Sequence, residues 1–252
     1  FKAFKDNMIS ALKSVKGSKG RNVIWEKKGY LDPNKVLIIG AHYDSLSYDK
    51  NSFVVDKKSR YQAADKNASG VSIALSLIEI LSEVDLAKTV RIVFFDFEEL
   101  GNLGSTSFIK KYQASMKKEE IFGFISLDRL GHDSRSKDLE KRYGNMKSYI
   151  RSDNEPGHGK DLTLSRKFLK HTKKLGLGIS FASEANGNKS SSHSSFWKAG
   201  YPAMLMSQNF EDDSNEKRHY TSNDFVESLN FKTLYKSYLF LSGSIITWAY
   251  DI

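Results

Sequence analysis

Two adjacent carboxylates follow directly on a largely apolar segment of the chain. The segment at 89–97 is rich in β-branched and aromatic residues, and Glu98 and Glu99 come immediately after it. A buried strand with acids at its carboxyl end is typical of an α/β sheet, since such sheets bind ligands at that edge. Neighbouring side chains cannot share one geometry, so one glutamate can hold a metal ion while the other transfers a proton. The alternative is a solvated strand end without chemistry.

Other histidine and acidic residues stand at comparable places. His42 follows the apolar run 35–41, Asp128 follows 121–127, and Asp65 precedes a periodic helix. In an extended chain His42 and Asp44 point the same way, so Asp44 can accept the second ring N–H of a metal-binding His42. The plainer alternatives are a surface hydrogen bond for the His42 pair and a helix N-cap for Asp65.

Taken together, these positions predict a metal centre that the fold must assemble. The chain has no cysteine, so any metal must be held by His, Asp and Glu. The candidate ligands are far apart in sequence; they are His42, Asp65, Glu99, Asp128 and His219. Such a set suits two zinc ions bridged by Asp65, which would lower the pKa of a bound water. Glu98 is then free to act as the general base.

The elements that must position these residues alternate between strands and helices. Strands are predicted at 22–28, 35–41, 89–97, 121–127, 178–182 and 203–207. Helices are predicted at 1–16, 71–84, 104–116, 161–176 and 231–249. An irregular loop is expected at 46–62, a turn-rich excursion at 132–160 with short structure near 145–151, and a Ser/Asn/Gly loop at 183–195. The alternation predicts an α/β fold, and the absence of a linker predicts one domain over residues 1–252.

Composition excludes several classes of function. The net charge of +9 is spread over scattered lysines, without the basic clusters of a nucleic-acid surface. The apolar stretches are too short or interrupted to span a bilayer. Because the chain begins at Phe1, we expect a missing upstream segment, with a removed signal peptide as one possibility, and hence a periplasmic or secreted protein. The sequence does not indicate an oligomeric state.

The motifs resemble those of the M28 family of zinc aminopeptidases. They occur in family order at 42–45, 64–70, 98–105, 127–131 and 193–203. The resemblance implies a three-layer sandwich of the zinc-dependent exopeptidase type, with a mixed, mostly parallel sheet flanked by helices. It implies one zinc on Asp65, Glu99 and a C-terminal histidine, and another on His42, Asp65 and Asp128. It also implies Glu98 as the general base, Asp44 as the support of His42, and a peptide substrate.

Three departures from the family pattern affect the site. Lys66 replaces the usual acidic or amide residue after the bridging aspartate, and we expect it to point away from the metals. Ser192 replaces the aspartate that usually precedes the loop histidine, so His193 has either a substrate contact or a structural hydrogen bond. His219 lies one residue before the usual ligand position, which is Tyr220. Either the loop absorbs the extra residue and His219 still binds zinc, which we favour, or one metal is weak or lost.

Two alternatives to an aminopeptidase remain open. A glutaminyl cyclase would use one zinc to cyclise its substrate, but 67–70 and 98–105 resemble the peptidases more, and Arg218 replaces a tryptophan expected of the cyclase. A catalytically dead binding domain is the other, disfavoured by the intact Glu98. The expected substrate contacts are Arg129, for carboxylate groups, His193, and Tyr220 as an oxyanion donor.

Overall fold

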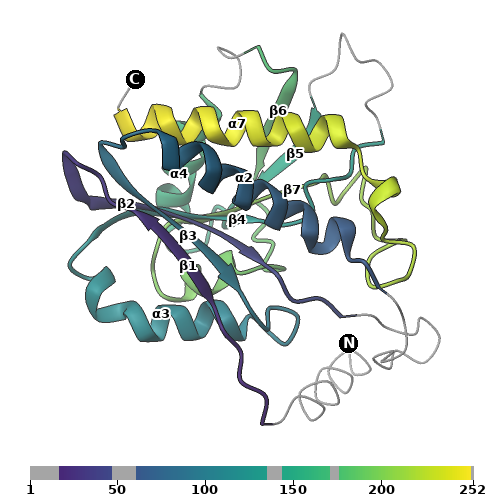
Figure 1. Ribbon diagram of the computed structural model, residues 1–252, viewed down its shortest axis with the longest axis horizontal. Coiled ribbons are helices and arrows are strands. Elements are labelled where there is room, and N and C mark those ends of the chain that lie inside the picture. Colours follow the sequence, from purple (N-terminus) through teal and green to yellow (C-terminus); the bar gives the residue numbers. More distant parts are fainter. Residues whose placement is uncertain (1–16, 47–60, 135–143, 171–175, 251–252) are drawn as a thin grey trace.

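A seven-stranded sheet forms the middle of the protein (Figure 1). The computed structural model describes residues 17–46, 61–134, 144–170 and 176–250. The strands are β1 (Val23–Lys27), β2 (Asp32–His42), β3 (Lys88–Phe95), β4 (Glu120–Leu127), β5 (Gly144–Tyr149), β6 (Ile179–Glu184) and β7 (Ala203–Ser207). Their order across the sheet is β1-β3-β2-β4-β7-β5-β6. The helices are α2 (Ser69–Glu83), α3 (Leu103–Met116), α4 (His158–Leu169), α6 (His193–Lys198) and α7 (Phe231–Tyr250), with short turns at Ala64–Ala68 and Val226–Ser228.

Most neighbouring strands run parallel. The pairs β2–β3, β2–β4, β4–β7 and β5–β6 are parallel, whereas β1–β3 and β5–β7 are antiparallel. The predicted α/β class with a mixed, mostly parallel sheet is therefore confirmed.

Helices cover both faces of this sheet. In β2, Leu37 and Ile39 pack in one apolar cluster with residues of α2, α4 and α7, whereas Val36 and Ile38 pack in another with residues of α3 and α6. Both sets are fully buried, which explains why the strand reads as a continuous apolar run. Figure 1 shows α2 and α7 over one face and α3 over the other, so the layers follow the predicted three-layer sandwich.

The predicted helix at 1–16 lies outside the described residues and stays a prediction. Other predicted segments differ from the structure. The short structure expected at 145–151 is a full strand, β5, stabilised by β6 and β7 on its two sides rather than by its own polar sequence. His193, expected in a loop, begins α6.

The parallel strands bring the predicted site residues to one edge of the sheet. His42 is the last residue of β2, Asp128 follows β4 directly, and Glu98 stands three residues after β3. None of the described helices is long and apolar enough to cross a membrane.

Candidate active site

His42, Glu98 and Asp128 form a buried cluster at the carboxyl edge of the sheet. One potential ligand atom from each lies within 4.8 Å of the others. His42 Nε2 is 3.6 Å from Asp128 Oδ1, and neither side chain is exposed. Asp128 Oδ1 accepts no hydrogen bond, although Arg129 Nε lies 3.3 Å away. A buried carboxylate oxygen without a hydrogen bond is costly, and a cation is one group that can satisfy it.

Asp44 orients the ring of His42, as predicted, but through its backbone carbonyl group rather than its carboxylate. Nδ1 of His42 lies 3.0 Å from the backbone carbonyl oxygen of Asp44 and 3.5 Å from its carboxylate. Because a carbonyl only accepts, Nδ1 carries the proton and Nε2 faces Asp128. The Asp44 carboxylate instead accepts the backbone N–H of Glu99 at 3.1 Å. Asp44 thus links the ends of β2 and β3.

Glu98 is held in place by two serine hydroxyls. Ser191 Oγ donates to Oε1 at 2.6 Å, and Ser192 Oγ donates to Oε2. Glu98 is only 5% exposed. Burial raises the pKa of Glu98, although the nearby His42 and Lys66 act in the opposite direction. A carboxylate with a raised pKa is better matched to proton transfer near neutral pH.

Lys66 points into the site, so the prediction that it points outward is wrong. Its Nζ lies 3.2 Å from His42 Nε2, 3.2 Å from Asp128 Oδ2 and 3.1 Å from Glu99 Oε1. That prediction presupposed bound metal ions, which would repel an ammonium group pointing inward. In the structure the ammonium group is the cation that three predicted ligands surround.

The charges at Lys66 and Asp128 support each other. Burial alone would lower the pKa of Lys66, but the Asp128 and Glu99 carboxylates outweigh it and hold that pKa well above its ordinary value. Burial would raise the pKa of Asp128, but Arg129 and Lys66 hold it well below its ordinary range. Both groups are therefore charged at neutral pH.

Glu99 lies between Lys66 and Tyr220. Its Oε1 faces the ammonium group, and its Oε2 accepts the Tyr220 hydroxyl at 2.9 Å. Burial and the Glu99 carboxylate raise the pKa of Tyr220, so the phenol keeps its proton. Tyr220 thus points inward, as its predicted role of oxyanion donor requires, but it gives its hydrogen bond to Glu99.

The two oxygens of Asp65 already accept hydrogen bonds. Oδ1 accepts from Gly131 N at 2.9 Å, and Ser69 Oγ, which donates to the Asp65 backbone carbonyl oxygen at 2.7 Å, lies 3.4 Å from it. Oδ2 accepts from Asn215 Nδ2 at 3.1 Å and lies 3.5 Å from His219 Nε2. Burial would raise the pKa of Asp65, but His219, Asn215 and Gly131 lower it. These contacts occupy one acceptor position on each carboxylate oxygen.

Asp224 anchors the turn that carries Asp65 and Lys66 through hydrogen bonds to its backbone. Asp224, which is fully buried, accepts the backbone N–H of Asp65 at 2.7 Å and that of Lys66 at 3.1 Å. The following helix packs closely on β4: a Cβ at Gly70 would lie 2.6 Å from the Leu127 carbonyl oxygen. The small residues predicted to allow a close approach of the backbone do so here.

His219 reaches Asp65 despite its shifted position in the sequence. The chain turns immediately after it, with Tyr220 at a φ of 61°. His219 Nε2 lies 3.5 Å from Asp65 Oδ2, so its ring is near the residue with which the favoured alternative would have it share a metal. Gln208 Nε2 lies 3.4 Å from His219 Nε2. Zinc binding by His219 stays a prediction.

The other two predicted substrate contacts differ in accessibility. The Arg129 guanidinium lies over the Phe210 ring at 4.2 Å, and its Nε has no hydrogen-bond partner. The His193 ring is fully buried, its Nε2 lies 2.5 Å from the Asn188 carbonyl oxygen, and Trp197 packs against it. His193 therefore has the structural role that was its alternative.

These contacts fit one metal ion better than two. One ion fits His42 and Asp128, whose donor atoms include an oxygen without a hydrogen bond, with Glu98 beside it as the proton acceptor. It would compete with Lys66 for His42 Nε2. A second ion would meet the Lys66 ammonium group among three of its expected ligands, and an Asp65 carboxylate whose two oxygens already accept hydrogen bonds.

The sequence did not reveal several contacts that shape this site. Ser191 and Ser192 hold Glu98, and Asn215 holds Asp65. Ser192 was recognised only as a departure beside His193, and the polar run that contains both serines was the available signal. Nothing in one sequence marks Asn215.

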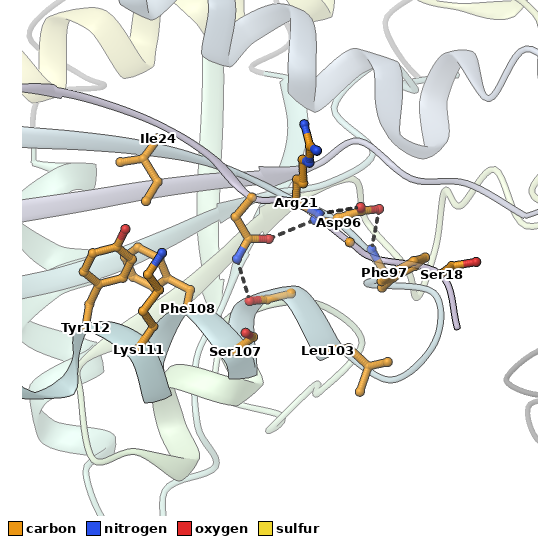
Figure 2. A pocket seen from close by; sticks show the side chains of 13 residues that line it. Ser18, Arg21, Ile24, Asp96, Phe97, Leu103, Ser107, Phe108, Lys111 and Tyr112 are labelled. Atoms are coloured by element: carbon orange, nitrogen blue, oxygen red, sulfur yellow. Dashed lines mark hydrogen bonds between the residues drawn. The ribbon is translucent and has the colours of Figure 1, made fainter. Parts of the chain in front are cut away.

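A separate hollow of about 670 Å³ opens between β1 and α3 (Figure 2). Asn22 spans part of its wall, accepting from Asp96 N at 3.1 Å and donating to the Gly104 carbonyl oxygen at 2.9 Å. Asp96 Oδ2 also accepts the backbone N–H of Arg21. No candidate site residue lines this hollow, so it is distinct from the buried cluster.

Comparison with known proteins gives consistent results. The model of Peptidase family M28 matches residues 22–241. Leucine aminopeptidase 1 of Aspergillus niger is 27% identical over 206 residues, which cover 79% of this chain and 48% of that protein. The chain thus spans about half the length of the curated relatives it matches.

Solved structures show the same fold. A zinc aminopeptidase from Bacillus subtilis superposes with a TM-score of 0.66 at 21% identity, covering 90% of this chain and 49% of that one. Glutaminyl cyclase from Porphyromonas gingivalis gives 0.67 at 18% identity, covering 96% and 88%. At these identities the likeness concerns the fold alone.

Proposed function

Because the chain belongs to peptidase family M28, as its motifs predicted, we propose that it is a metal-dependent aminopeptidase that removes the N-terminal residue of a peptide. The observation that carries the proposal is the buried cluster of His42, Glu98 and Asp128, in which a metal-binding group and a proton acceptor meet. The names of an Aspergillus leucine aminopeptidase and a Bacillus zinc aminopeptidase point to the same reaction.

Glu98 is the residue that moves the proton in this proposal. Zinc held by His42 and Asp128 would supply Lewis acidity and a more acidic bound water. Glu98 accepts the proton of the attacking water and returns it to the amine that leaves. Ser191 and Ser192 fix the carboxylate for both transfers. Glu99, held by Lys66 and Tyr220, keeps the neighbouring backbone in place.

Arg129 is the proposed contact for a carboxylate of the substrate. Its side chain is 12% exposed, with Nε buried 3.3 Å from Asp128 Oδ1 and Nη2 donating to Ser190 Oγ at 3.3 Å. Stacking on Phe210 holds the guanidinium plane. A planar fork of N–H donors is suited to bidentate binding of a carboxylate. We therefore propose a preference for short peptides, whose C-terminal carboxylate lies near the bond that is cleaved.

A peptide-binding domain without catalysis is the second candidate. The observation that favours it is the Lys66 ammonium group among His42, Asp128 and Glu99. A cation built into the chain can keep the site folded with no metal at all. Glu98 and its two serines favour the enzyme.

An extracytoplasmic location belongs to the same proposal. The net charge of +9 is suited to an anionic cell envelope. Fractionation of the source cells with an antibody against the chain would test it: recovery in the cytoplasm alone would contradict this location.

Mass spectrometry of the reaction products tests the proposed function. The zinc-loaded protein is incubated with a peptide that begins with glutamine. An aminopeptidase releases free glutamine and a shorter peptide. A product lighter by ammonia would show a glutaminyl cyclase instead, and an unchanged peptide that still binds the protein would show the non-catalytic domain.

A further inference from the structure

We propose that Lys66 takes the place of one metal ion, so that its ammonium group neutralises the site from within and the protein binds no more than one divalent cation there. The inference goes beyond the proposed function, because it concerns the number of ions and holds for an enzyme and for a binding domain alike.

The contacts of Lys66 are those of a cation in a binding site. Its Nζ lies 3.1–3.2 Å from His42 Nε2, Asp128 Oδ2 and Glu99 Oε1. The ammonium group donates a hydrogen bond to Asp128 Oδ2 and forms an ion pair with Glu99 Oε1, and the His42 ring lies against its third side. All three residues are predicted to bind zinc. They belong to the ends of three different strands, so Lys66 joins the strand ends as a metal ion would.

The backbone holds Lys66 in this orientation. Its N–H donates to Asp224 Oδ2 at 3.1 Å, and its carbonyl oxygen accepts from Ser45 Oγ at 3.1 Å. The residue is 2% exposed. A charged amine at this depth is stable only with charged or hydrogen-bonded partners. Turning it outward would leave Asp128 and Glu99 buried without their shared cation.

The charges around Lys66 favour fewer metal ions. Lys66 lies against the Asp128 and Glu99 carboxylates, and Arg129 lies against Asp128. Each of these cations of the chain neutralises part of the negative charge that divalent ions would otherwise balance.

The state of Asp65 leads to the same count. Two closely spaced zinc ions need a carboxylate between them, and Asp65 was the predicted bridge. Its oxygens already face Gly131, Ser69, Asn215 and His219. Lys66 is the next residue in the chain, so the turn that would present the bridge presents an ammonium group instead.

Metal counting in the presence and absence of Lys66 tests the inference. The full chain is loaded with excess zinc, freed of unbound metal by gel filtration, and analysed by plasma mass spectrometry. We expect at most one zinc per chain in the wild type and about one more in Lys66→Asn. Lys88→Met is the matched control. Lys88 is also buried, but its ammonium group donates to the Trp248 carbonyl oxygen. Lys88 is the first residue of β3, at the end of the strand opposite Glu98. Its zinc content should equal that of the wild type.

Thermal unfolding provides a second readout. In the presence of a chelator, Lys66→Asn should unfold at a lower temperature than the wild type, because Asp128 and Glu99 lose their cation. Added zinc should raise the unfolding temperature of the variant back to that of the wild type. Two zinc ions per wild-type chain would overturn the inference even if no variant folds. A Lys66→Asn protein that gains no zinc would also overturn it, since another group would then exclude the ion. No substrate is present in either experiment, so the result is independent of whether the protein hydrolyses peptides.

Discussion

Mild acid should destabilise this protein through His193, a buried histidine outside the metal cluster. Its ring is fully buried, its Nε2–H is used by the Asn188 carbonyl oxygen, and its Nδ1 has no partner. A second proton would therefore place a charge on Nδ1 in the protein interior. Burial lowers the pKa of His193 to about 4.

The size of the effect follows from linkage. The unfolded chain binds a proton at a pKa of about 6.5, and the folded protein at about 4. Between these values the unfolded state binds more protons, so stability falls as the pH falls. At about 1.4 kcal/mol per pH unit over about 2.5 units, His193 alone costs about 3 kcal/mol. The loss begins near pH 6.5 and is complete just below pH 4.

Urea unfolding between pH 7 and pH 4 measures this loss. His193→Gln keeps an N–H donor for Asn188 and removes the titrating ring. The variant should be less stable at pH 7, where packing against Trp197 is lost. It should then lose about 3 kcal/mol less than the wild type on going to pH 4. Other titrating groups contribute equally to both proteins. Parallel stability curves over this interval would refute the reasoning.

Two further predictions concern the supports of the site. Asp224→Asn should lower the free energy of unfolding by about 2 kcal/mol, because one of the two backbone N–H groups loses its buried acceptor. Asp153→Asn, at an exposed carboxylate, is the control in urea unfolding. Equal stability of the two variants would contradict the role of Asp224. Gly104→Ala should cost about 3 kcal/mol, since its Cβ would lie 2.1 Å from the Asp96 carbonyl oxygen. Gly159→Ala, on an open helix surface, should instead gain about 0.5 kcal/mol, and thermal unfolding that ranks Gly104→Ala above it would contradict the packing described.

Most of the sheet was predictable because its strands carry their own signals. The apolar runs that became β2, β3, β4 and β7 are buried on both faces, and each ends near its predicted residue. Since parallel strands end at one edge, the grouping of His42, Glu98 and Asp128 followed from the fold class. β5 was not recognised because its polar sequence is held as a strand by β6 and β7.

The roles within the site were less predictable than its location. The direction of Lys66 depends on Asp224 and Ser45, which are distant in the sequence and fix its backbone in space. The prediction presupposed bound metal ions that would repel Lys66. In the structure Lys66 is buried and pairs with two carboxylates of the site. Likewise, the sequence places His219 one residue early, and only the turn at Tyr220 shows how it still reaches Asp65.

The most direct test of the account is the activity of Glu98→Gln. The amide keeps the size of the side chain and one oxygen, but it cannot accept the proton of the attacking water. With zinc-loaded protein and an aminoacyl amide as substrate, we predict that the rate of hydrolysis falls by a factor of about 10²–10⁴ while the zinc content stays that of the wild type. Wild-type activity in Glu98→Gln with its metal retained would contradict the role of Glu98, and with it the proposed mechanism.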